Sequence, residues 1–143
     1  MGTSLNPALD RGQIEGGFLQ GVGWLTSEEL VWSKDGALQT HSPSTYKIPA
    51  CRDWPERARI DFFGAPNREP TIHGSKAVGE PPLMLALSVF HALRDAIASA
   101  AAGRAAPRLQ APATPEAILT ALAQLQADAS TAAAAHPEQW VAQ

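Results

Sequence analysis

The chain has 143 residues, which fits one domain of ordinary size. Its formal net charge of −3 argues against a nucleic acid as partner, because such proteins present a basic face. The single cysteine, Cys51, excludes an intramolecular disulfide and favours a reducing, cytoplasmic location. We find no apolar run of about 18 residues and therefore expect no membrane span and no membrane partner.

The first element that the pattern predicts is a glycine-rich helix over residues 12–30. Ile14, Phe18, Val22 and Leu25 recur at helical spacing, while Gly12, Gly16, Gly17, Gly21 and Gly23 interrupt it. Each glycine inside a helix costs about 1 kcal/mol relative to alanine. A helix with so many glycines has another backbone or a ligand pressed against it. Tight helix packing and ligand contact both remain open at this point.

Strand-forming residues follow this helix. Residues 29–32 and 37–40 flank Ser33-Lys34-Asp35-Gly36, and Asp-Gly is a typical hairpin turn. Residues 59–63 alternate apolar and charged side chains, as a strand does. The segment 44–49 ends in a proline, and we interpret it as mainly structural. Together with the helices, these segments predict an α+β fold.

The second half of the chain is predicted to be helical. An apolar stripe over residues 81–102 indicates a long helix, and residues 103–115 form a proline-containing linker. Thr114 and Pro115 are typical of a helix start, here of a shorter helix that ends near Gln126. Residues 127–143 are alanine-rich and are expected to be a frayed tail, which leaves 1–126 as the folded portion.

The corner Gly79-Glu80-Pro81-Pro82 holds one carboxylate between residues that free and then fix the backbone. From the residues alone, Glu80 is either a structural or a catalytic group. Cys51 is expected to be a buried or half-buried thiol. His41, His73, His91 and His136 have no ligand spacing, so we expect no metal bound directly by the protein.

Three motifs together carry a resemblance to a known family. They are residues 5–23 (Leu5-Asn-Pro to Gly21-Val-Gly23), Pro43-Ser-Thr-Tyr-Lys-Ile-Pro49 and Ser75-Lys-Ala-Val-Gly-Glu-Pro-Pro82. In this order they resemble the C-terminal part of the molybdenum-binding subunit of the xanthine dehydrogenase and aldehyde oxidase family. The resemblance covers about residues 4–126. It implies that the chain is a fragment of a molybdopterin-binding domain.

The resemblance also implies roles for individual residues. Glu80 matches the family's active-site base, which serves the hydroxylation of an electron-poor carbon with water as the oxygen source. Gln13 matches a glutamine beside the molybdenum–molybdopterin cofactor, with Gly12 next to it. The backbone of Ser75, Lys76, Ala77, Val78 and Gly79 is expected to line the same site.

Further partners follow from the family as expectations. The substrate would be hypoxanthine or xanthine, oxidised to urate, with NAD as final acceptor. The rest of the molybdenum subunit, FAD and 2Fe-2S clusters would lie in other parts of the enzyme, and the isolated chain would be inactive. A fragment without its neighbours exposes an apolar face, so we also expect either oligomers or poor solubility. Two alternatives stay open: a non-catalytic folding or interaction module, and the equivalent part of an oxidase for aldehydes or other N-heterocycles.

Overall fold

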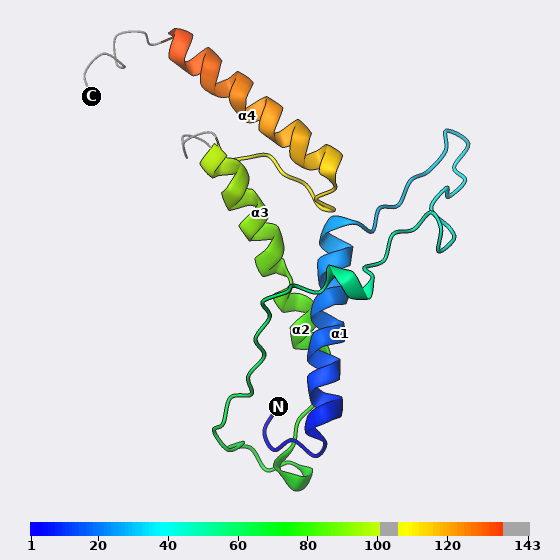
Figure 1. The fold of residues 1–143 in the computed structure, drawn as a ribbon, viewed down its shortest axis with the longest axis vertical. Helices are drawn as coiled ribbons and strands as arrows, with labels where there is room; N and C mark the ends of the chain where they lie inside the picture. Colours follow the sequence, from blue (N-terminus) through cyan, green and yellow to red (C-terminus); the bar gives the residue numbers. More distant parts are fainter. Residues whose placement is uncertain (101–105, 136–143) are drawn as a thin grey trace, which may run out of the picture.

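A computed structural model of the chain describes residues 1–100 and 106–135, and the side chains of residues 133–135 are not described. The helices are α1 (Pro7–Thr26), α2 (Glu80–Leu85), α3 (Leu87–Ala100) and α4 (Pro115–Ala135). Two short 3-10 helices lie at Cys51–Asp53 and Ile72–Gly74. In Figure 1, α2 crosses the middle of α1, α3 continues away from α2, and α4 lies beside the far end of α3.

The predicted α+β class is wrong, because the described residues contain helices and no strand. Pairing is limited there to two isolated antiparallel bridges, Gly2 with Ser75 and Trp32 with Leu38. Residues 59–63 are extended without a neighbouring strand to take their backbone hydrogen bonds. An alternating pattern becomes a strand only when such a partner exists.

The predicted hairpin exists only as a turn with one bridge. Gly36 has a φ of +80°, which confirms the Asp-Gly turn. Beyond it, the amide of Val31 donates to the Thr40 hydroxyl at 3.1 Å, and that of Ala37 donates to the Ser33 hydroxyl at 3.0 Å. Side-chain oxygens accept these two amide hydrogens, and the bridge does not extend into a ladder.

Helix α1 begins earlier than predicted, at Pro7 rather than Gly12. The side chain of Asn6 accepts a hydrogen bond from the amide of Leu9 at 3.2 Å, and Pro7 occupies the first helical position. Asparagine followed by proline is therefore a helix start here rather than only a turn.

Helix α2 packs directly against two glycines of α1. This contact confirms tight helix packing, one of the two interpretations of the glycines, for this part of α1. A Cβ built on Gly17 would stand 3.2 Å from the carbonyl oxygen of Gly79, and one on Gly21 would overlap the carbonyl oxygen of Leu83. By contrast, a Cβ on Gly12 or Gly16 would meet no atom within 4 Å. Gly12 and Gly16 are thus open, Gly17 and Gly21 pack against α2, and a Cβ on Gly23 would overlap the ring of Pro49.

The predicted long helix is interrupted at Ala86. The amide of Ala86 bonds to the carbonyl of Leu83 at 3.3 Å, three residues back, so α2 ends in a tighter turn before α3 begins. The stretch Glu80–Ala100 is nevertheless long and apolar enough, by length and composition, to cross a membrane. Three features favour a helix packed within a protein over a membrane span. They are the interruption at Ala86, the adjacent charged residues Arg94 and Asp95, and the packing of Ile97 against α4. Residues 101–102 of the predicted helix lie outside the described part of the chain.

The main apolar cluster lies between α3, α4 and the segment before α4. Its buried members are Ile97, Leu109, Ala113, Ala121 and Leu125. Thr114 caps α4 as predicted, its hydroxyl accepting from the amide of Ala117 at 3.2 Å. Helix α4 continues past the predicted end at Gln126 as far as Ala135, and residues 136–143 of the predicted tail lie outside the description.

The chain exposes far more surface than a compact protein of its mass. Its accessible surface is 10867 Å², whereas a compact 15.1 kDa monomer exposes about 7,100 Å². Large apolar side chains contribute to this surface, among them Trp24 and Trp32, each 59% exposed. Cys51 is also exposed, so the expectation of a buried or half-buried thiol is wrong. It lies in the 3-10 helix Cys51–Asp53, none of whose residues is buried.

Candidate functional site

Glu80 is the first residue of α2, where the long segment 54–79 meets α1. Gly79 precedes it with helical dihedral angles, φ −69° and ψ −53°, and Pro81 and Pro82 complete the first turn. Pro82 is buried, while the side chain of Glu80 is exposed. The corner is therefore held from one side, and its carboxylate faces outward.

Gln13 lies beside this corner. Its side-chain oxygen Oε1 is 4.0 Å from the point where a Cβ would stand on Gly79. Gln13 is exposed on α1, and Gly12 next to it has open space where a side chain would be. An exposed amide, which both donates and accepts, thus adjoins the backbone immediately before Glu80.

The start of the chain holds the segment 74–76 in place. The amide of Lys76 donates to the carbonyl of Met1 at 2.7 Å, and that of Thr3 donates to the carbonyl of Gly74 at 2.9 Å. Ser75, half-buried, forms the isolated bridge with Gly2. Backbone hydrogen bonds therefore join residues 1–3 to residues 74–76, a few positions before the Glu80 corner.

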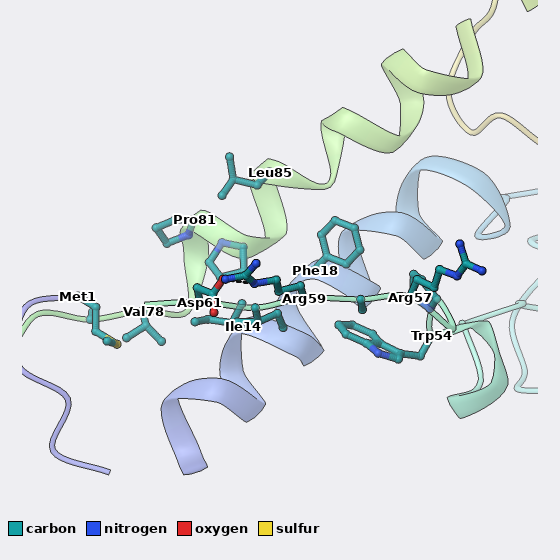
Figure 2. Close-up of a pocket in the computed structure, with 15 residues that line it drawn as sticks. Met1, Ile14, Phe18, Trp54, Arg57, Arg59, Asp61, Val78, Pro81 and Leu85 are labelled. Atoms are coloured by element: carbon teal, nitrogen blue, oxygen red, sulfur yellow. Dashed lines mark ion pairs between the residues drawn. The ribbon is translucent and has the colours of Figure 1, made fainter. Parts of the chain in front are cut away.

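A cavity of about 570 Å³ adjoins the corner. Side chains from α1, from α2 and from the extended segment 54–61 converge on it (Figure 2). Ala77 and Val78, two of the predicted site residues, belong to its wall. The residues that complete most of the wall are Met1, Ile14, Phe18, Trp54, Pro81 and Leu85.

The sequence did not single out the aromatic part of this wall. The rings of Phe18 and Trp54 meet edge to face, with centroids 6.3 Å apart and planes at 83°. This arrangement is favoured by the charge distribution of aromatic rings. The available signal was the apolar spacing of Phe18 on α1, but nothing in the sequence linked it to Trp54, 36 positions later.

Charge lies at the open edge of the cavity. Arg59 and Asp61 form an ion pair at 2.6 Å, drawn as a dashed line in Figure 2, and both side chains are well exposed. Such a pair contributes little to stability. Within the described residues, no three His, Cys, Asp or Glu side chains group as metal ligands.

Comparison with known proteins adds the decisive observation. Residues 1–55 match the family described as "Molybdopterin cofactor-binding domain". "Xanthine dehydrogenase/oxidase" of Gallus gallus is 52% identical over 124 residues, covering 85% of this chain. "Aldehyde oxidase 1" of Bos taurus is 47% identical over 121 residues, covering 82% of it. The chain belongs to the xanthine dehydrogenase and aldehyde oxidase family.

The fold supports the same assignment. The solved structure "Crystal Structure of the Cu,Mo-CO Dehydrogenase (CODH); Carbon monoxide reduced state" matches with a TM-score of 0.72 and 26% identity over 87% of this chain. Because residues 1–55 match the molybdopterin cofactor-binding family, this member of the xanthine dehydrogenase family is a fragment of such a domain. The chain spans 9% of the length of each of these two relatives and 15% of the solved chain.

Proposed function

We propose that this chain forms part of the cofactor site of a xanthine dehydrogenase-type molybdenum hydroxylase and that Glu80 is its active-site base. The observation that carries the proposal is the outward-facing carboxylate of Glu80 at a backbone corner seated on α1, with Gln13 beside Gly79. About half of the aligned residues are identical to those of proteins named xanthine dehydrogenase.

The residues present fit a molybdenum–molybdopterin group. Gly12 and Gly16 leave the α1 backbone open to a close neighbour, and a side chain at either position would fill that space. The Gln13 amide and the backbone of residues 75–79 would hold the group's polar edge. When bound, the cofactor supplies the two-electron oxidation of a substrate carbon, with water as the source of the new oxygen.

Glu80 then has a defined task. Overall, xanthine, water and NAD⁺ give urate, NADH and one proton, so a proton must leave the oxygen that is added to the substrate. A carboxylate held within hydrogen-bond reach of that oxygen can accept the proton. The two prolines after Glu80 restrict its backbone, which supports a fixed position for the carboxylate.

We propose a purine as substrate, oxidised in the cytoplasm and with FAD and 2Fe-2S clusters carrying electrons onward in other parts of the enzyme. A relative named aldehyde oxidase is 47% identical and one named xanthine dehydrogenase/oxidase is 52% identical, so an aldehyde or another N-heterocycle is the alternative substrate.

A non-catalytic interaction module is the second candidate function. The large exposed surface of the chain favours it, because apolar side chains such as Trp24 and Met84 remain uncovered.

The experiment compares variants of the chain co-produced with the rest of the molybdenum subunit. Glu80→Gln should lower kcat for xanthine by about 10²-fold or more, since positioned acid–base groups contribute about 10²–10⁴-fold. Molybdenum content and assembly should not change, because the side chain is exposed. Glu116→Gln is the matched control, since Glu116 is an exposed carboxylate in the first turn of α4.

The outcomes separate the candidates. Loss of kcat in Glu80→Gln alone supports the base assignment. Unchanged turnover in that variant contradicts it. Normal assembly of a complex that turns over neither purine nor aldehyde supports the module.

A further inference from the structure

The C-terminal end of α1 is tied to the segment 44–49 by a side-chain hydrogen bond. The hydroxyl of Tyr46 donates to Oε2 of Glu28 at 2.6 Å, and both residues are partly buried. Glu28 stands just beyond α1, its amide bonded to the carbonyl of Gly23 at 2.9 Å. Hydrogen bonds to charged groups are the stronger kind in proteins.

Two further contacts join the end of α1 to the segment 44–49. The hydroxyl of Ser27 donates to the carbonyl of Lys47 at 2.8 Å. The ring of Pro49 lies against Gly23 so closely that a Cβ there would overlap it, and Oε1 of Glu28 borders the same spot. The motif at residues 43–49, to which the proposed chemistry gives no part, therefore forms a brace on the end of α1.

This brace lies next to α2. Glu28 and Tyr46 line a cavity of about 630 Å³ whose wall also contains Leu83 and Met84 of α2. From the other side, the amide of Ala113 donates to the carbonyl of Leu25 at 2.7 Å. The last turn of α1 is thus held between two segments, and α2 rests on Gly17 and Gly21 of that helix.

We propose that Tyr46 and Glu28 are positioning residues for the Glu80 corner. Their hydrogen bond fixes the end of α1, α1 fixes α2 through Gly21, and α2 begins with Glu80. Helix α1 transmits this constraint as a rigid element over about 10 Å. The inference rests on the proposed role of Glu80, because only that role makes the placement of α2 matter for turnover.

The test uses two readouts on the same variants. In the full chain, Tyr46→Phe should speed hydrogen exchange by roughly tenfold both at the end of α1 and at residues 83–86 of α2. In the assembled enzyme, it should lower kcat several-fold and leave KM unchanged. Glu28→Ala should behave like Tyr46→Phe, and Glu28→Gln, which keeps an acceptor, should restore most of the loss.

Thr131→Val is the matched control, because the Thr131 hydroxyl donates to the carbonyl of Ala127 within α4, outside the brace. It should leave both readouts unchanged. Faster exchange at the end of α1 without any change in α2 would reduce Tyr46 to a loop contact and overturn the inference. Unchanged kcat in Tyr46→Phe, with Glu80→Gln inactive, would also overturn it. Should Glu80→Gln itself be fully active, the proposed function fails, while the exchange data still decide whether the brace holds α2.

Discussion

Gly21 of α1 and Leu83 of α2 approach so closely that a Cβ on the glycine would overlap the carbonyl oxygen of the leucine. Backbone cannot move aside as the end of a flexible side chain can. The contact therefore fixes where α2 lies along α1, and with it the position of Glu80.

Gly21→Ala should destabilise the chain by about 2 kcal/mol, because overpacking outweighs the gain in helix propensity. Gly16→Ala is the matched control: a Cβ there meets nothing within 4 Å, so the variant should be neutral or more stable. Urea unfolding followed by far-UV circular dichroism measures both. Equal stability of the two variants would contradict the close contact between α2 and Gly21.

The edge-to-face pair of Phe18 and Trp54 should show a measurable coupling. A double-mutant cycle with Phe18→Leu and Trp54→Leu is expected to give about 1 kcal/mol, typical of such aromatic pairs. Additive effects of the two substitutions would mean that segment 54–61 does not rest on α1.

The alkaline titration of Tyr46 reports on the brace directly, since it is the only tyrosine of the chain. The hydrogen bond to Glu28, then burial, then the charge of Glu28 raise the pKa of Tyr46 above its ordinary value of 10.0. The folded state thus favours the protonated phenol. This stabilisation is fully present below pH 10.0 and is lost as the pH rises through the folded-state pKa.

Ultraviolet titration of phenolate formation should therefore place the Tyr46 midpoint above that of a free tyrosine. Glu28→Gln should move it back toward the ordinary value, because the charged acceptor is gone. A midpoint that is the same with and without the Glu28 carboxylate would show that the bond is absent in solution.

Ile97 anchors the α3–α4 cluster and is only 3% exposed. Ile97→Ala should cost about 2–5 kcal/mol, through lost burial and a residual cavity. Leu119→Ala on the exposed face of α4 should change stability by no more than about 0.5 kcal/mol. Thermal unfolding of the two variants distinguishes them, and similar losses would place the cluster elsewhere.

Local sequence signals predicted the features that depend on residues nearby in the sequence, such as helix starts and turns. Thr114 and Pro115 marked the start of α4, Gly36 marked a turn, and the glycines of α1 indicated a close backbone. The predicted strands are absent from the described residues, because residues 59–63 have no partner strand, and no local pattern reveals whether such a partner exists. The exposure of Cys51 and the pairing of Phe18 with Trp54 likewise depend on contacts distant in sequence.

The family motifs, more than the chemistry of single residues, predict the site. Residue chemistry indicated a rigid carboxylate at Glu80 but gave it no role. Only the fold placed Gln13 next to Gly79, because helix α1 brings one turn of its exposed face to that corner. The aromatic wall of the cavity needed the same long-range information.

The main apolar cluster lies between α3 and α4, whereas Glu80 lies on the seam between α1 and α2. Substitutions in the cluster would therefore alter the amount of folded protein in the cell, because a loss of about 1–2 kcal/mol in folding stability increases degradation. Substitutions at the α1–α2 seam would instead alter what each surviving molecule does. Mutational variation should accordingly separate into effects on protein abundance and effects on turnover per molecule.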